Sequence, residues 1–376
     1  MKMETPLPRV RCPEEDAKNI RKEKMEKETL LLRALDPAAD GENIQRAGAI
    51  LRQGGIVAIP TETVYGLAGN ALDPAATEKI YAAKGRPSDN PLIVHIADWE
   101  DLSPLVREVP EEAAILAKEY WPGPLTIILE KSAVVPDTTS GGLDTVAVRM
   151  PDHPIAQAVI RAAGVPLAAP SANRSGSPSP TSWRHCREDL WGRVDAILQS
   201  ADCRVGVEST VLSLCREAGV ATRRPRLLRP GAVTLEQLRE TLGEVTVDRG
   251  VLERISPGET VRSPGMKYRH YAPAAEVVLV RGSRESYRQY LGQNRRPGEY
   301  AVCFAEELGG VPPPVLSFGG EGDHAAQAER LFDLLRELDR LGAKKVYVHA
   351  PATDGVGLAV YNRLVRAAAF QVVELP

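Results

Sequence analysis

Residues 55–69 read GIVAIPTETVYGLAG, and this stretch decides the fold. Its first six letters, GIVAIP, are a short apolar run between glycine and proline, which is typical of a buried strand. The chain before it, from Asp40 to Gln53, has the pattern of a capped helix that ends at a glycine pair, and Ala75 to Lys84 reads as a second helix. Strand and helix therefore alternate around this stretch, which predicts an α/β fold with a largely covered sheet.

The alternation extends over two regions of the chain. The first runs from about residue 30 to residue 248 and includes the strand patterns PLIVHIA, PLTIILE and TVAVRMP. Residues 249–275 carry prolines and glycines that argue against a regular element. A second pattern begins at residue 276, with the strands EVVLVRG, EYAVCFA and KKVYVHAP and helices over 325–341 and 356–369. We predict a charged extension over 1–29, a first α/β domain over 30–248, an ordered linker over 249–275 and a smaller α/β domain over 276–376.

Composition excludes several classes of protein. Of the 376 residues, 43% are hydrophobic and 26% are charged, which excludes whole-chain disorder. The net charge of −3 gives no chain-wide basic footprint for nucleic acid. No apolar run reaches the ~18 residues of a membrane helix, and the charged first 28 residues lack the apolar core of a secretory signal. The five cysteines form no C-x-x-C pair, so we expect reduced thiols and a cytoplasmic location.

Five polar segments lie at strand ends or in loops of the first region, where α/β proteins bind ligands. Cations stand in or near them at Lys84, Arg86, Arg149 and Arg229, and four cations converging on one cleft would suit a polyphosphate. No P-loop motif is present, and no complete G-x-G-x-x-G follows a strand, so any nucleotide is bound by other means. The segments are PTETVYGLAG from residue 60, KGRPSDNPLIVHI from 84, VAVRMPDHP from 146, APSANRSGSPSPT from 169 and ESTVLSL from 208.

The same residues have plainer interpretations. Lys84 and Arg86 can simply complement a helix dipole. His95 alternates with apolar residues in PLIVHIA and can be a satisfied core histidine, while Thr61 and Thr63 can support a turn. Residue types and spacing alone therefore predict an α/β protein with an anion-binding cleft.

Taken together, four motifs resemble the YrdC-type family of L-threonylcarbamoyladenylate synthases. They are PTETVYGL, KGRP…NPL, SAN and ESTV…RPG, and they occur in the family's order between residues 30 and 248. The segment SPGMKYRHYAP and the region after it resemble the longer, two-domain branch of that family. The resemblance implies a twisted mixed sheet with a concave basic cleft in the first domain, and a small Rossmann-like α/β domain after the linker.

The resemblance also implies a reaction, in which L-threonine, bicarbonate or CO2 and ATP give threonylcarbamoyl-AMP and pyrophosphate. Mg2+ would be bound mainly through the phosphates of ATP, with no metal ligand assigned to the protein. A partner enzyme or complex, a tRNA threonylcarbamoyl transferase, would then modify the adenosine next to the anticodon, and direct tRNA contact stays open. The implied threonine-binding residues are Thr63, His95, Arg149, Ala169 and Ser209, and the implied ATP-binding residues are Lys84, Arg86, Asn90, Thr145, Ser171, Ser179 and Arg229.

Three questions stay open at this point. A non-catalytic module that holds double-stranded RNA on a concave surface is one alternative function. A carbamoyl-transfer domain of the kind found in hydrogenase-maturation proteins is another, although this chain lacks their acylphosphatase and zinc-finger regions. The stretch CREAGVATRRPRLL before RPG is long, so the sequence alone does not decide between Arg223 and Arg229 as the arginine that serves the site.

The linker carries a dense set of donors and rings between two turn-forming segments, at Lys267, Tyr268, Arg269, His270 and Tyr271. A plain tether would be Gly/Ser-rich or extended and Pro-rich. We therefore predict a lid across the cleft of the first domain. The alternative is a strap packed on the outside of either domain.

Overall fold

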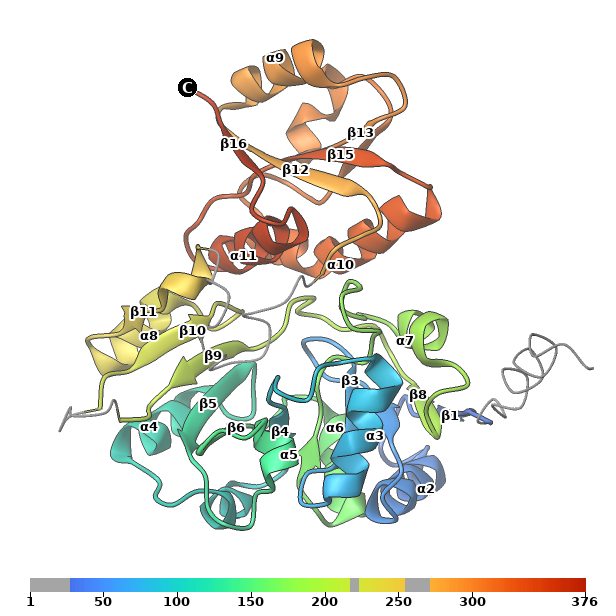
Figure 1. Ribbon diagram of the computed structural model, residues 1–376, viewed down its shortest axis with the longest axis vertical. Coiled ribbons are helices and arrows are strands. Elements are labelled where there is room, and N and C mark those ends of the chain that lie inside the picture. Colours follow the sequence, from blue (N-terminus) through green and yellow to red (C-terminus); the bar gives the residue numbers. More distant parts are fainter. Residues whose placement is uncertain (1–27, 217–222, 254–270) are drawn as a thin grey trace, which may run out of the picture.

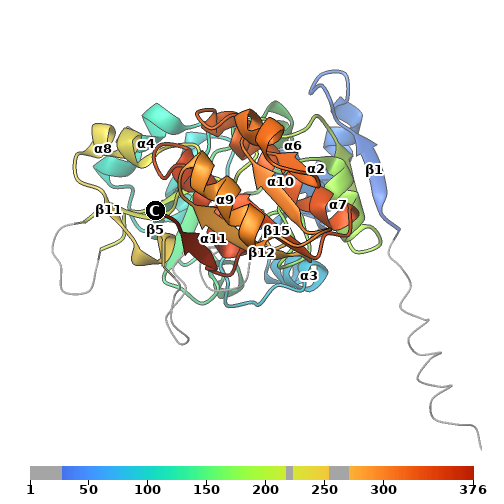
Figure 2. The same cartoon turned by 90° about the horizontal axis from the view of Figure 1, so that it is seen from above.

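Two bodies built on separate sheets are stacked along the long axis of the molecule (Figure 1). The computed structural model describes residues 28–216, 223–253 and 271–376. The larger body holds an eleven-stranded sheet formed by residues up to 247, and the smaller holds a five-stranded sheet that begins at residue 276. Seen from above, the smaller body covers the middle of the larger one (Figure 2).

The larger sheet mixes parallel and antiparallel pairs, as predicted. Its strand order is β1-β8-β2-β3-β7-β4-β6-β5-β9-β10-β11. The strands are β1 (Leu30–Arg33), β2 (Val57–Ile59), β3 (Gly66–Asn70), β4 (Ile93–His95), β5 (Leu125–Glu130), β6 (Thr145–Arg149), β7 (Leu167–Ala168), β8 (Ala196–Gln199), β9 (Thr210–Ser213), β10 (Arg226–Arg229) and β11 (Thr246–Val247). The helices are α2 (Gly41–Arg52), α3 (Pro74–Lys84), α4 (Glu111–Tyr120), α5 (Asp137–Ser140), α6 (Pro154–Ala163), α7 (Trp183–Leu190) and α8 (Leu235–Leu242).

Strand β2 shows why this sheet is covered on both sides. Val57 and Ile59 belong to the apolar cluster that includes α2 and α6, whereas Ala58 belongs to the cluster that includes α3, α4, α7 and α8. Successive side chains of a strand point to opposite faces, so the two clusters lie on opposite faces of β2. The stretch over residues 55–69 holds one more strand than predicted. Its last part forms β3, which pairs antiparallel with β2.

The smaller sheet is parallel throughout, in the order β14-β13-β15-β12-β16. Helix α9 lies on its far side, and α10 and α11 lie between the two sheets (Figure 1), so the predicted Rossmann-like arrangement is confirmed. The predicted helices over 325–341 and 356–369 correspond to α10 and α11, while α9, β14 and β16 were not predicted. The bounds are β12 (Glu276–Arg281), α9 (Arg284–Asn294), β13 (Tyr300–Cys303), β14 (Val315–Ser317), α10 (His324–Arg340), β15 (Lys345–His349), α11 (Gly357–Ala367) and β16 (Val372–Glu374).

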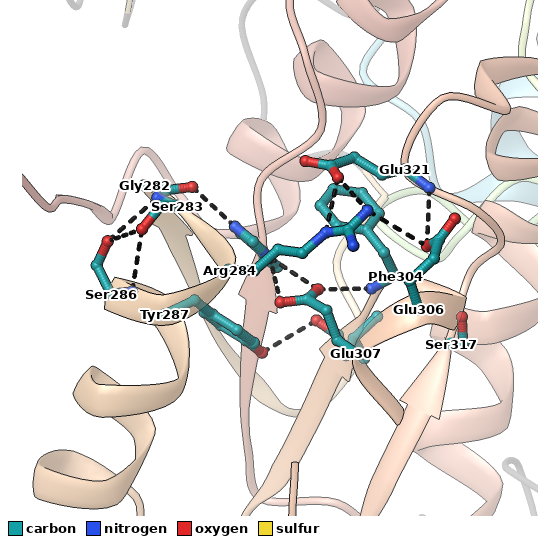
Figure 3. Close-up of polar contacts among 12 residues, drawn as sticks. Gly282, Ser283, Arg284, Ser286, Tyr287, Phe304, Glu306, Glu307, Ser317 and Glu321 are labelled. Carbon is teal, nitrogen blue, oxygen red and sulfur yellow. Dashed lines mark hydrogen bonds and ion pairs between the residues drawn. The ribbon is translucent and has the colours of Figure 1, made fainter. Parts of the chain in front are cut away.

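A polar network ties the carboxyl ends of β12, β13 and β15 together (Figure 3). His349 is buried, and its Nδ1 lies 2.8 Å from Glu307 Oε2 while its Nε2 lies 3.0 Å from the carbonyl oxygen of Gly282. Its ring also stacks on Tyr287, with the ring centroids 4.4 Å apart. These contacts fix the turn between β12 and α9 against the loop after β13.

The two bodies meet through close backbone and apolar contact. Val64 and Val207 of the larger body pack in the core cluster of the smaller one, together with Tyr271. Gly206 has a φ of +78°, and a Cβ there would overlap backbone atoms of α10. The predicted boundaries at 248 and 275 stay a prediction, although the two sheets fall on either side of them. Among the described residues, no helix is both long enough and apolar enough to cross a bilayer.

Candidate functional site

A cleft opens where β4 and β6 end and where β9 begins. Strands β4 and β6 are parallel, and their register pairs His95 with Arg149, so both side chains stand at the same sheet edge. The short segment after β2 and the loop after β7 close the cleft from the neighbouring strands. The cleft-lining residues are Thr61, Thr63, Val64, Gly66, Arg86, Pro91, Ile93, His95, Arg149, Ala169, Pro170, Ser171, Glu208, Ser209, Arg229 and Tyr271.

All five predicted threonine-binding residues line this cleft. Of the seven predicted ATP-binding residues, Arg86, Ser171 and Arg229 also line it, whereas Lys84, Asn90, Thr145 and Ser179 do not. The structure thus brings together eight of the twelve predicted residues from segments far apart in the sequence. Their binding roles stay a prediction.

Arg149 is the most connected cation of the cleft. Its Nη1 donates to Thr63 Oγ1 at 2.9 Å, its Nε donates to the carbonyl oxygen of Gly123 at 3.2 Å, and its Nη2 lies 2.6 Å from Glu62 Oε1. Both members of the Arg149–Glu62 pair are buried. Burial alone would raise the pKa of Glu62, but the Arg149 charge and hydrogen bond outweigh it and lower the pKa. Sequence reasoning missed Glu62, although it stands inside the motif PTETVYGL.

The hydroxyls of Thr61 and Thr63 form a directed chain. Thr61 Oγ1 donates to the carbonyl oxygen of Val64 at 2.6 Å, so its only proton is committed. Thr63 Oγ1 therefore donates to Thr61 Oγ1, which lies 2.9 Å away, and accepts from Arg149. Because Thr63 also lines the cleft, its remaining lone pair can accept a hydrogen bond from a ligand.

His95 is a neutral histidine in this structure. Burial, and then the charge of Arg149, lower its pKa to about 3. Its Nδ1 lies 3.2 Å from the carbonyl oxygen of Ile93. A neutral ring adds no positive charge to the cleft and can contact a ligand by hydrogen bonding and packing.

The low pKa of His95 predicts a loss of stability in acid. Above about pH 6.5 the ring is neutral in the folded and unfolded chain, and it adds no pH dependence. Below that pH the unfolded chain takes up a proton that the folded chain binds only near pH 3, so the free energy of unfolding falls. We expect His95→Gln to reduce this fall between pH 6.5 and pH 4, as measured by urea unfolding at each pH. Equal pH slopes for the two proteins would contradict the buried neutral state.

Ser209 and Arg229 line the cleft as a hydrogen-bonded pair. Arg229 Nε donates to the carbonyl oxygen of Ser209 at 3.0 Å, and its Nη2 donates to Ser209 Oγ at 3.1 Å. Ser209 Oγ also lies 2.7 Å from Thr126 Oγ1. Burial lowers the pKa of Arg229 below its usual value, but guanidinium groups stay charged in proteins. Arg223 instead pairs with Glu108 away from the cleft, so the structure separates the two arginines that the sequence left undivided.

Glu208 lines the cleft beside Ser209 and was also missed. Its Oε1 accepts from Ser179 Oγ at 2.5 Å, and its Oε2 accepts from Arg363 Nε at 3.0 Å. Burial raises its pKa, but the charges of Arg363 and then Arg229 lower it overall, so the carboxylate is ionised. Ser179, a predicted ATP ligand, therefore lies behind the cleft wall, bound to Glu208. The motif ESTV could have pointed to Glu208, but no sequence signal pointed to Arg363.

Arg86 and Lys84 differ in what they contact. Arg86 lines the cleft, with Nη2 donating to the carbonyl oxygen of Pro91 at 3.0 Å, and burial lowers its pKa to about 10. Lys84 is buried beneath the loop after β7. Its Nζ donates to the carbonyl oxygens of Ser171 and Asn173, the latter at 2.7 Å, and to Asn173 Oδ1 at 3.3 Å. These three acceptors match the three ammonium protons, so Lys84 anchors the loop that carries Ser171.

The remaining predicted residues lie at the margins of the site. Asn90 is buried behind Arg86, which donates to its carbonyl oxygen at 3.3 Å, and Thr145 begins β6, at the far end of that strand from Arg149. Of the predicted lid, residues 267–270 lie outside the described residues. Tyr271 is buried, lines the cleft and packs on Phe332, with ring centroids 5.4 Å apart.

The charge of the cleft is mixed. Three arginines line it together with the Glu208 carboxylate, so a uniformly basic cleft stays a prediction. Within the described ranges, no three His, Cys, Asp or Glu side chains gather in a way that could hold a metal ion. The site is therefore suited to a ligand with anionic groups, bound by guanidinium, hydroxyl and backbone donors.

Comparison with known proteins places the chain in a family. One family model, described as "Telomere recombination" and covering the Sua5, YciO and YrdC proteins, matches residues 49–231, and a second, "Threonylcarbamoyl-AMP synthase, C-terminal domain", matches residues 233–369. Curated threonylcarbamoyl-AMP synthases of Pyrococcus abyssi and Bacillus subtilis are each 45% identical to it, and the matches span 88% of this chain and 96% and 94% of theirs.

A solved structure supports the same placement. The crystal structure of P. abyssi Sua5 complexed with L-threonine superimposes with a TM-score of 0.84 at 42% identity, covering 93% of this chain and 99% of that one. Motifs, fold and relatives thus coincide over nearly the whole length. The chain belongs to the threonylcarbamoyl-AMP synthase family, in the branch that carries the C-terminal domain.

Proposed function

We propose that this protein makes threonylcarbamoyl-AMP and pyrophosphate from L-threonine, bicarbonate or CO2, and ATP. The observation that carries the proposal is the cleft itself, which Arg149, Thr63, Ser209, Arg229 and Arg86 line together. A relative that is 42% identical binds L-threonine in a crystal, which supports the first substrate.

The reaction needs positioned substrates and no covalent enzyme intermediate. The neutral threonine amine adds to CO2 and releases one proton to solvent, which gives a carbamate, and a carbamate oxygen then attacks the α-phosphorus of ATP. The bond from the α-phosphorus to the bridging oxygen breaks, and pyrophosphate leaves with that oxygen. Arg86 and Arg229 would stay in place while negative charge moves onto the leaving pyrophosphate, and their positive charges would stabilise the transition state.

We assign the residue roles from the chemistry of the side chains that line the cleft. We assign the threonine carboxylate to the Arg149 side of the cleft, because a guanidinium binds a carboxylate with paired donors. The lone pair of Thr63 faces the same region and can accept from the threonine hydroxyl or amine. We assign the phosphate groups to Arg86, Ser171 and Arg229, which line the same cleft, and Lys84 supports them by holding the Ser171 loop.

Mg2+ fits this site as an ion carried by the substrate. Glu208 is the one carboxylate among the described cleft-lining residues, and both its oxygens are engaged by Ser179 and Arg363. We therefore propose that Mg2+ is bound by phosphate oxygens and water, and that it would offset the charge of the triphosphate.

Pyrophosphate release tests the proposed function. We expect release from ATP only when threonine and bicarbonate are both present, and without tRNA. An RNA-binding module would release no pyrophosphate, and a carbamoyl-transfer domain would not depend on threonine. Release that is indifferent to either co-substrate would contradict the proposal.

Valine tests how the threonine end of the site works. It has the shape of threonine but no hydroxyl, so a donor or acceptor in the buried pocket would be left unpaired. A buried group left unpaired costs about 3 kcal/mol or more, so we expect kcat/KM for valine to fall by at least about 100-fold. Equal turnover of the two amino acids would show that no residue here reads the hydroxyl.

Two further proposals concern the fate of the product and the residue that covers the cleft. We propose that the product passes to a tRNA threonylcarbamoyl transferase in the cytoplasm, because the mixed anhydride is reactive and needs an acceptor enzyme. We also propose that the ring of Tyr271 shields the bound ligand from water. Tyr271 lines the cleft, and the next residue, Ala272, donates its backbone N–H to the carbonyl oxygen of Gly176 in the loop after β7 at 3.0 Å.

A further inference from the structure

Arg363, in the middle of α11, reaches out of the smaller body into the wall of the cleft. The side chain is fully buried, although it carries a charge. Its Nε donates to Glu208 Oε2 at 3.0 Å and its Nη2 donates to the carbonyl oxygen of Glu208 at 3.2 Å. Its Nη1 donates to the carbonyl oxygen of Pro230. A buried guanidinium is tolerated when its protons are matched in this way by a carboxylate and carbonyl groups.

The acceptors of Arg363 stand next to the cleft residues in the chain. Glu208 precedes Ser209, and Pro230 follows Arg229. Ser209 and Arg229 are themselves joined by two hydrogen bonds, at 3.0 and 3.1 Å. One guanidinium thus fixes the backbone on both sides of a hydrogen-bonded pair of cleft residues.

The arrangement of the bodies makes this contact possible. Helix α11 lies over the β9–β10 end of the larger sheet (Figure 1), and every residue of the helix is buried. The ring of Tyr271, which lines the cleft, faces the same guanidinium at 5.9 Å. The smaller body therefore contributes to the site through α11 and through the segment that leads into β12.

We propose that Arg363 is a positioning residue for the synthase reaction, so that the cleft is complete only when the smaller body is docked. The proposal rests on the proposed function. Arg363 holds Glu208 and Pro230, and through them it positions the bonded pair of Ser209, a proposed threonine contact, and Arg229, a proposed ATP contact. Its loss should therefore weaken the use of both substrates together.

Arg336 provides a matched control. It lies on α10, is buried, and also crosses between the bodies, with Nη2 donating to the carbonyl oxygen of Pro178 at 2.6 Å and to Asp189 Oδ2 at 2.8 Å. Neither acceptor lines the cleft. A variant at Arg336 therefore loses a comparable contact between the bodies. Arg336 holds no residue next to Ser209 or Arg229, and its nearest link to the cleft is indirect, through Ser179, which follows Pro178 and bonds Glu208.

The test compares Arg363→Met, Arg363→Lys and Arg336→Met in the full chain. Pyrophosphate release is measured with threonine and ATP varied separately, below the unfolding temperature of each variant. We expect Arg363→Met to lower kcat/KM for both substrates roughly 30-fold or more, Arg363→Lys to recover part of the loss, and Arg336→Met to stay within about 3-fold of wild type. The double variant Arg363→Met with Glu208→Gln removes both buried charges, and we expect it to regain stability but not activity.

Each outcome is decisive. Full activity of Arg363→Met beside an active wild type would overturn the positioning role and leave the proposed function standing. Equal losses in Arg363→Met and Arg336→Met would reduce Arg363 to a docking contact and overturn the proposal. Recovered activity in the double variant would show that an unpaired Glu208 charge, and not lost positioning, caused the defect. A wild type that needs neither threonine nor bicarbonate would contradict the proposed function, and with it this proposal.

Discussion

Arg149→Met is expected to lower kcat/KM for threonine by roughly 1,000-fold. The substitution removes the proposed partner of the threonine carboxylate, and loss of one partner of a buried, hydrogen-bonded charge pair costs about 2–5 kcal/mol or more. The same substitution leaves the buried Glu62 carboxylate without its counter-charge, 2.6 Å from where Nη2 stood. We therefore expect the free energy of unfolding to fall by about 3–5 kcal/mol. Urea unfolding and pyrophosphate release with varied threonine measure the two effects.

A second substitution separates the two roles of Arg149. Arg149→Met combined with Glu62→Gln removes both buried charges, so most of the lost stability should return. Activity should stay low, because the group that we propose to bind the threonine carboxylate is then missing. If the double variant regains activity along with stability, Arg149 is a structural ion-pair partner, and the threonine assignment on this wall is wrong.

Arg86→Ala is expected to weaken ATP binding by ~2–4 kcal/mol, or between about 30-fold and 1,000-fold. Arg86 lines the cleft, and a guanidinium can bond two phosphate oxygens at once. Lys84→Gln is the comparison, because its ammonium protons are already matched by Ser171 and Asn173. We expect Lys84→Gln to lower the free energy of unfolding by ~1–3 kcal/mol. We also expect it to weaken ATP binding less than Arg86→Ala does.

Calorimetric titration with ATP and thermal unfolding without ligand distinguish these two residues. An unchanged ATP dissociation constant in Arg86→Ala would remove Arg86 from the site. A larger affinity loss in Lys84→Gln than in Arg86→Ala would mean that the ordered Ser171 loop matters more for phosphate binding than the arginine does.

Local pattern was sufficient where an element buries an apolar run. The strand in GIVAIP and the helices α10 and α11 were predicted from local pattern, whereas the Rossmann-like second domain was predicted from the family resemblance. Strand β3 was not predicted as a strand, because GLAGN consists mostly of small residues and follows a polar segment of the chain. It becomes a strand through its pairing with β2 and β7. Helix α9 was missed because polar residues dominate it and only Tyr287 and Leu291 are buried.

The cleft-lining residues at strand ends could be predicted from the sequence. The residues whose role is to contact a side chain far away in the sequence were missed. The parallel register of β4 and β6 explains how His95 and Arg149 meet. Glu62 and Glu208 were overlooked because their task is to hold arginines, and that depends on packing. Arg363 stands 155 residues from Glu208 in the chain, and no local pattern encodes such a contact.

Direct detection of the product tests the central claim, that this cleft joins threonine, bicarbonate and ATP. The protein is incubated with ¹³C-bicarbonate, L-threonine and ATP without tRNA, and the mixture is analysed at once by mass spectrometry. We predict a labelled threonylcarbamoyl-AMP that is absent when any substrate is omitted and nearly absent for the Arg149→Met, Glu62→Gln double variant. A wild type that forms no labelled adduct, or a double variant that forms as much as the wild type, would contradict the account.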